Sequence, residues 1–579
     1  MTRSLWAALA AALLLGTANF APAQTASTAG LKPVLTVSIA GYGKVHSDVE
    51  TIGKLGGKPE LANMLEGILA MVTQGKGVTG LGIDKARPWG AVAYADAAGK
   101  FPVYGFIPTN DVKQLLALLA PPPLTPDAQG VYKVLVKTTT LYVVQKGAWA
   151  FVSNNPENLA KLPADPAALL GDLTTRFTVA VRASVKNVPA AMRDQAIAGF
   201  EMGLQMQMAQ RPNESDDEYA VRQNLSRQSL EKAKVLINEL DEVLLGWGVD
   251  ATTGAMHLDF EMTAQSGTKT ARQFAQMKGA TTDFAGLALP GAAVVANWTG
   301  TIDETDAAQM KVALGGIRKK ALKDLDGNSD LTPEQIAVAK ALLGDVADVA
   351  AKTIDGKKID GGLALLLDNA TPTPAPTLAL ASVVADGEKL NSVVKRLVAE
   401  AGKDDPNIAK LFTLDAEKHQ GVSIHTAALP VTDEAAAKVL GSTLNVALGI
   451  GDTGLYLAAG RDALKTIKQV IGDSKANAGK KAAPLEITVS ATPIAKFAAQ
   501  AGGGNPMAGA VVAMLARSAG KDHLTLKAKS IPNGTSVRLE IEEGLLKVIL
   551  NFAQPGAMGT GPTPRPAPAP APAGGDPFK

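Results

Sequence analysis

The sequence has 579 residues, of which 46% are hydrophobic and only 4% are aromatic. Its 57 basic and 55 acidic residues give a formal net charge of +2, which provides no electrostatic basis for nucleic-acid binding. The chain contains no cysteine, so disulfides, thiol nucleophiles and Cys-ligated metals are excluded, and its five histidines form no HExxH pair. A chain of this length is expected to form more than one domain.

Residues 1–23 have the pattern of a secretory signal peptide. Arg3 precedes an apolar run from Leu5 to Leu15, and the small residues Ala21 and Ala23 stand just before the cleavage site. The run is short for a membrane span. The sequence therefore predicts cleavage after Ala23, export to the periplasm or the exterior, and no transmembrane segment in the mature chain.

In chain order, residues 34–40 read as a strand, and residues 48–72 carry one helical pattern. Strand pairs and a three-stranded meander are expected over residues 89–153. A long helix begins after Ser215, whose hydroxyl, with Glu218 three positions on, makes a capping box.

Two strong hairpin signals close the two halves of the chain. Leu245–Asp250 and Met256–Met262 flank a Gly-containing turn, and the stretch from His523 to Gly544 turns at Asn533-Gly534. The order of strand, hairpin, meander, strand and closing hairpin occurs twice. We therefore expect an α+β fold with two similar lobes, at 30–285 and 290–552, each an antiparallel sheet with helices packed on one face. The alternative is two unrelated α+β domains.

Two segments fall outside that repeat. Helical patterns on both sides of residue 328 predict a helix–loop–helix insertion near 305–352. Residues 555–579 are rich in proline and alanine, which predicts a disordered, extended tail.

The segment from Gly246 to Gly300, with the helix that precedes it, resembles a stretch that recurs in secreted proteins predicted from planctomycete-type bacteria. The resemblance is most specific over residues 211–302. It implies an exported, duplicated α+β protein and carries no activity to transfer.

A calcium-like loop lies outside that segment, in DLDGNSDLTPEQ. In EF-hand register the ligands are Asp324, Asp326, Asn328, the carbonyl of Asp330, and Gln335. Hard oxygen ligands at alternating positions suit calcium, but Ser329 replaces the turn glycine and Gln335 the bidentate glutamate. Thr332-Pro333-Glu334-Gln335 is also a capping box, so the alternative is a capped helix–turn–helix connection without metal.

Catalytic signatures are absent from the sequence. Ser229 with Lys232, and Ser392 with Lys395, match S-x-x-K, but neither is accompanied by the partner motifs of an acyl-serine site. No cofactor is therefore predicted apart from calcium. The leading hypothesis is an exported, non-enzymatic envelope protein that binds a protein or a small apolar ligand through a sheet face or an inter-lobe cleft. The alternatives are a calcium-modulated version of that protein and a hydrolase with an unrecognised site.

Overall fold

The computed structural model describes residues 31–552, apart from residues 73, 74, 76, 97, 98, 118–123, 137, 138, 213, 330, 369–374 and 502–505. The predicted signal peptide at 1–23 and tail at 555–579 lie outside this part of the chain.

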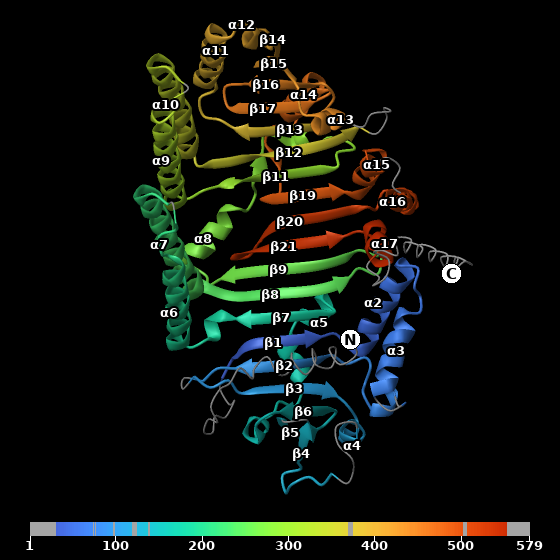
Figure 1. Cartoon of the computed structure of the whole chain (residues 1–579). Helices are drawn as coiled ribbons and strands as arrows, with labels where there is room; N and C mark the ends of the chain where they lie inside the picture. Colours follow the sequence, from blue (N-terminus) through green and yellow to red (C-terminus); the bar gives the residue numbers. More distant parts are fainter. Residues whose placement is uncertain are drawn as a thin grey trace, which may run out of the picture.

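One antiparallel sheet runs through the whole described structure (Figure 1). The sheet has nineteen strands, and each strand pairs with its neighbours in an antiparallel orientation. From one edge to the other they are β14 (Phe412–His419), β15 (Val422–Pro430), β16 (Thr443–Ile450), β17 (Gly454–Gly460), β13 (Ala375–Val383), β12 (Lys358–Asp368), β11 (Val294–Thr301), β19 (Leu485–Ser490), β20 (His523–Ile531), β21 (Gly534–Ile541), β9 (Met256–Ala264), β8 (Leu240–Val249), β7 (Val179–Ser184), β1 (Pro33–Ile39), β2 (Trp89–Tyr94), β3 (Val103–Pro108), β6 (Trp149–Ser153), β5 (Thr139–Lys146) and β4 (Tyr132–Val136). A separate ribbon pairs β10 (Thr281–Thr282) with β18 (Lys480–Lys481).

Helices stand along both ends of the strands (Figure 1). The column on the left of the view contains α6 (Ala190–Gln207), α7 (Asp216–Glu239), α8 (Lys269–Gln276), α9 (Glu304–Asp326), α10 (Pro333–Asp355), α11 (Gly387–Asp404) and α12 (Pro406–Lys410). The column on the right contains α2 (Tyr42–Leu55), α3 (Leu61–Val72), α15 (Ala491–Ala501), α16 (Pro506–Ala516) and α17 (Glu543–Phe552). No described helix combines the length and the apolar character that a membrane span requires.

Shorter helical segments connect or cover the strands. They are η1 (Thr79–Leu81), α4 (Val112–Leu116), η2 (Pro156–Leu159), η3 (Pro166–Leu170), α5 (Leu173–Arg176), η4 (Val185–Asn187), η5 (Ala285–Leu287), α13 (Glu434–Leu440) and α14 (Ala463–Ala476). Several helices begin at a residue whose side chain accepts a hydrogen bond from a backbone N–H of the first turn. Asp303 caps α9, Thr332 caps α10 and Asp386 caps α11.

The expected α+β class is confirmed, but the sheet organisation differs from the prediction. In place of one sheet per lobe there is a single sheet, because β9 pairs with β21 along eight residues from Met256↔Ile541 to Thr263↔Gly534. The two closing hairpins predicted from the sequence therefore lie side by side at the centre of the sheet. The predicted helix–loop–helix near 305–352 corresponds to α9 and α10, inserted between β11 and β12.

Helices also cover both faces of the sheet, where packing on one face was expected. Val422 and Ile424 of β15 belong to a core with Ile467 and Ile471 of α14. The next side chain, His425, points to the opposite face, and its Nε2 lies 2.8 Å from Oδ1 of Asn391 in α11. The prediction of helices on one face is therefore wrong at this end of the sheet.

Candidate binding face

The central strands present an apolar face and a charged face. Side chains alternate between the two faces of a strand. In β9, Leu258 and Phe260 point to one face, and Asp259 and Glu261 point to the other. The strand register then places apolar side chains of neighbouring strands beside one another across the sheet. One row consists of Ile39, Val179, Trp247, Leu258, Leu539, Leu526, Ile487, Ala296, Leu363, Leu380 and Leu457.

The middle of the apolar face is open. Leu245 is 46% exposed, and Leu35, Val179, Leu258 and Phe260 are each 36–41% exposed. We call the open region the apolar strip. It consists of side chains from six neighbouring strands, all half-buried or exposed: Leu35, Val37, Ile39, Val179, Val181, Leu245, Trp247, Leu258, Phe260, Val537, Leu539 and Leu526. A contiguous exposed apolar patch marks an interaction surface more often than isolated apolar residues do.

The same face is covered beyond the strip. Trp89, which pairs with Ile39, packs against the same buried cluster as Leu65 and Leu69 of α3. At the opposite end of the sheet, the face is covered by α11 through the hydrogen bond between Asn391 and His425. Between the strip and α11 the face stays partly open, since Leu378 of β13, on the same face as Leu380, is 36% exposed.

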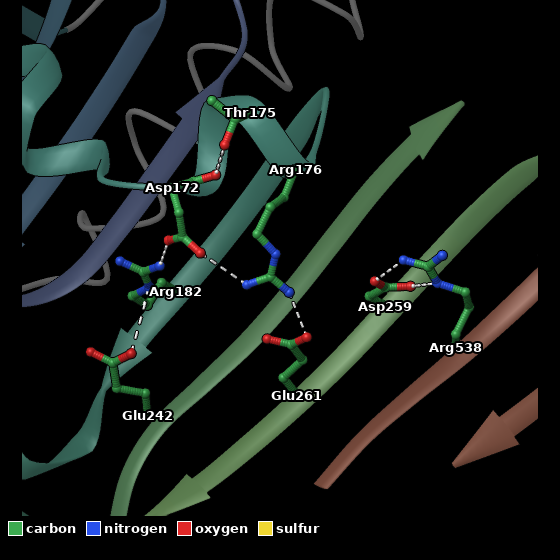
Figure 2. Close-up of polar contacts among 8 residues, drawn as sticks. All are labelled: Asp172, Thr175, Arg176, Arg182, Glu242, Asp259, Glu261 and Arg538. Carbon is green, nitrogen blue, oxygen red and sulfur yellow. Dashed lines mark hydrogen bonds and ion pairs between the residues drawn. The ribbon is translucent and has the colours of Figure 1, made fainter. Parts of the chain in front are cut away.

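The reverse face carries a network of ion pairs (Figure 2). Asp172, which precedes α5, accepts hydrogen bonds from Arg176 at 3.1 Å and from Arg182 of β7 at 2.5 Å. Arg176 continues to Glu261 at 2.5 Å, and Arg182 lies 3.6 Å from Glu242. Burial alone would raise the pKa of Asp172, but the two guanidinium groups hold it below its ordinary value.

One pair in this face bridges the two halves of the chain. Arg538 of β21 donates two hydrogen bonds of 2.7 Å to the carboxylate of Asp259 in β9. The hydrogen bonds that Arg538 donates to the Asp259 carboxylate raise the pKa of Arg538 above its ordinary value. Each charge in the network is paired with an opposite charge, so the ion pairs link neighbouring central strands. None of the paired groups in this network is arranged as an activated nucleophile.

The predicted calcium ligands are spread over a helix end and a helix start. Asp324 and Asp326 lie in the last turn of α9, Asn328 follows in the connecting turn, and Asp330 lies outside the described residues. Asp326 pairs with Lys340 of α10. Within the described residues, no group of three or more His, Asp or Glu side chains gathers to hold a metal.

Gln335 takes part in the capping box that was the alternative to the calcium loop. Its Oε1 accepts from the backbone N–H of Thr332 at 2.7 Å, and its own N–H donates to Oγ1 of Thr332 at 3.2 Å. Asp324, Asn328 and Gln335 line, together with apolar residues and other polar side chains, a hollow of about 920 Å³ between α9, α10 and α11. Calcium binding at 324–335 remains a prediction.

The lysines of the two S-x-x-K matches are engaged in ion pairs. Lys232 pairs with Asp306, and Nζ of Lys395 lies 2.6 Å from Oδ2 of Asp415. Charged lysines of this kind do not serve as general bases.

The sequence predicted binding through a sheet face or an inter-lobe cleft, without naming the residues of the apolar strip. The alternation of Leu258 and Phe260 with Asp259 and Glu261 shows that β9 has one apolar face and one charged face. Alternation alone does not tell whether a helix covers the apolar face.

No known protein family, curated protein or solved structure matches this chain.

Proposed function

We propose that the protein is an exported, non-enzymatic binding protein whose binding surface is the apolar strip. The observation that carries this proposal is the exposure of Leu35, Val179, Leu245, Leu258 and Phe260 on one face of neighbouring strands. Leaving such side chains in water costs free energy that a bound apolar partner would recover, at roughly 25 cal/mol per Å² of apolar surface.

Export is supported by the sequence of residues 1–23, with its charged start, short apolar run and small residues at the cleavage site. The absence of cysteine from the whole chain means that folding in an oxidising compartment requires no disulfide formation. We also infer an internal duplication. In the first half the strands run β4-β5-β6-β3-β2-β1-β7-β8-β9, and the second half gives β15-β16-β17-β13-β12-β11-β19-β20-β21 in matching order, with β14 added at the edge.

The duplicated order explains where the strip lies. If each half ends in a hairpin with a free outer strand, joining β9 to β21 removes both edges. This strand pairing places the two half-sheets edge to edge, and the resulting face is wider than the face of either half.

The test is binding of an apolar fluorescent dye, 1-aminoanthracene, to the full mature chain. We expect the dye to bind and the double substitution Leu245→Ser with Phe260→Ser to weaken binding. Both side chains are more than 40% exposed, so their replacement should leave the fold intact.

The matched control is Leu135→Ser. Leu135 is 65% exposed on β4, at the edge of the sheet and outside the strip. Equal dye binding by the wild type and the double variant would show that the strip is not the binding surface.

A further inference from the structure

The hollow between α9, α10 and α11 is a second candidate site, and it shares no residue with the apolar strip. α10 packs against both α9 and α11, and the three helices stand in the column on the left of Figure 1. The hollow has a volume of about 920 Å³ and extends from the turn between α9 and α10 to the second half of α11. Binding sites for small organic molecules have volumes of roughly 300 to 1,000 Å³.

The floor of the hollow is apolar. Val338 and Leu342 are one helical turn apart on α10, and Ala339 and Leu343 repeat this spacing one position further on, so all four lie on one side of the helix. Leu397 of α11, which is 56% exposed, adds apolar surface from the neighbouring helix. A mainly apolar lining with a few charged groups is the usual composition of a site for a small organic molecule.

Negative charge is in excess around the hollow, which is lined by the carboxylates of Asp324, Glu334 and Glu400 and by the ammonium group of Lys403. Lys403 is already paired with Glu400, its Nζ lying 2.7 and 2.8 Å from the two carboxylate oxygens. Within the described part of the chain, Asp324 and Glu334 form no ion pair. The turn between α9 and α10 therefore places two uncompensated negative charges at one end of an apolar hollow.

The helix ends explain only one of these two carboxylates. Glu334 lies in the first turn of α10, where the helix dipole favours negative charge. Asp324 lies in the last turn of α9, where the dipole disfavours negative charge. A positive charge in the hollow would offset this unfavourable interaction.

We propose that the hollow binds an organic cation with an apolar group, its ammonium group at the turn beside Asp324 and Glu334 and its hydrocarbon part over Val338 and Leu342. Charge complementarity selects a cation over a neutral or anionic molecule. The apolar floor selects a molecule with a hydrocarbon part over an inorganic ion, because an inorganic ion would leave that floor in water. This site is separate from the apolar strip, so the inference holds whether or not the strip binds a ligand.

Three naphthalene probes of similar shape test the charge preference. They are 1-naphthylmethylamine, which is a cation at neutral pH, the neutral 1-naphthylmethanol and the anion 1-naphthoate. Titrating each probe with the full mature chain and following its fluorescence anisotropy measures the affinities. We expect the amine to bind at least about tenfold more tightly than the alcohol, and the carboxylate to bind more weakly than the alcohol. Added sodium chloride should weaken binding of the amine and leave binding of the alcohol nearly unchanged, because salt screens exposed charges.

Substitutions at the hollow test its location. Asp324→Asn should lower the affinity for the amine by about three- to fivefold and leave the affinity for the alcohol unchanged. Asp326→Asn is the matched control, because Asp326 lies in the same helical turn but pairs with Lys340 and does not line the hollow. Leu397→Asn should weaken binding of both probes, because it removes apolar contact area. All three positions are exposed, and circular dichroism melting of each variant shows whether the fold is retained.

The results separate this inference from the proposed function. Loss of amine affinity in Asp324→Asn but not in Asp326→Asn supports the inference, even if 1-aminoanthracene does not bind to the apolar strip. Equal affinities for the three probes, no binding of any of them, or equal effects of the two aspartate variants would overturn it. If amine binding persists in Asp324→Asn and is lost in Leu245→Ser with Phe260→Ser, the amine binds at the apolar strip. That result overturns this inference and leaves the proposed function standing.

Discussion

The side chain of Asp259 is 3% exposed, and Arg538, whose side chain is 42% exposed, donates two hydrogen bonds to its carboxylate. Removing the guanidinium would leave a buried charge without these donors, which is more costly than losing an exposed ion pair. Lys527 and Glu486, on two neighbouring strands of the same face, form such an exposed pair, with Nζ 2.7 Å from Oε1.

We expect Arg538→Met to lower the free energy of unfolding by roughly 2 kcal/mol, a value reduced for the partial exposure of the arginine. The matched change Lys527→Met should cost less than about 1 kcal/mol. Urea denaturation of both variants measures the difference. In an Asp259→Asn background the cost of Arg538→Met should shrink, and equal costs in the two backgrounds would contradict the buried-charge explanation.

His425 is a second residue whose protonation state is determined by its surroundings. Its Nδ1 accepts a hydrogen bond of 3.0 Å from the backbone N–H of Asp415, and Nε2 lies 2.8 Å from Oδ1 of Asn391, so the neutral ring with a proton on Nε2 satisfies both contacts. Burial lowers the pKa of His425 from its ordinary value of 6.5. The Asp415 carboxylate acts in the opposite direction and Lys395 in the same direction as burial, and these two charges pair with each other.

A lowered folded-state pKa means that the unfolded chain takes up the proton first as the pH falls. The stability contributed by neutral His425 is therefore complete above pH 6.5 and is lost as the pH falls from there through the folded-state pKa. We expect the melting temperature to fall more steeply between about pH 7 and about pH 5 in the wild type than in His425→Gln, whose side chain does not titrate. Parallel profiles for the two proteins would show that His425 does not contribute.

At the scale of elements, the connection between α9 and α10 joins helix ends that already satisfy their own backbone groups. Gly327 ends α9, and the reciprocal bonds of Thr332 and Gln335 begin α10. Asp324 and Asp326 are helical, so an ion would have to unwind the last turn of α9 to bring them together as EF-hand ligands.

We expect calcium to bind at 324–335 no more tightly than about 10⁻⁴ to 10⁻³ M. Gln335→Glu keeps the capping box, because glutamate serves equally at that position, and it adds the second carboxylate oxygen that the site lacks. Titration calorimetry of the wild type, Gln335→Glu and Asp324→Ala checks this. If Gln335→Glu releases no calcium-dependent heat at millimolar ligand, residues 324–335 form a capped turn without a metal function.

Local elements were accessible from the sequence because short-range patterns determine them. The hairpin at Leu240–Val249 and Met256–Ala264 extends the predicted strands by a few residues. The single helical pattern over 48–72 divides into α2 and α3, where Gly57 adopts a φ of 67°, a conformation that glycine reaches without strain.

At the scale of the whole molecule, the pairing of strands that lie far apart in the chain could not be predicted from the sequence. The pairing of β9 with β21 joins residues about 280 apart, and no local signal specifies which free edge meets which. The apolar strip depends on where α8, α3 and α11 pack, which alternation along a strand does not reveal. The α+β class and the closing hairpins could therefore be predicted, whereas the single sheet and its open face required the structure.

The seam between β9 and β21 decides whether the molecule behaves as one unit. Gly534 begins β21 opposite Thr263, and a Cβ at this position would lie 2.3 Å from the carbonyl oxygen of Met262. Since that oxygen belongs to the backbone of the neighbouring strand, a side chain at Gly534 must push β21 away from β9. The displacement would begin at the turn and extend toward the pair of Arg538 and Asp259.

We expect Gly534→Val to lower the melting temperature and to divide a single calorimetric transition into two, because the two halves would then lose the strand pairing that couples them. The matched control is Gly300→Val in β11, where a Cβ would meet nothing within 4 Å and where valine is a favourable strand residue. Gly300→Val should melt as the wild type does. If the two valine variants melt alike in one transition, the β9–β21 seam does not couple the halves, and each half must be stable without the pairing that unites the sheet.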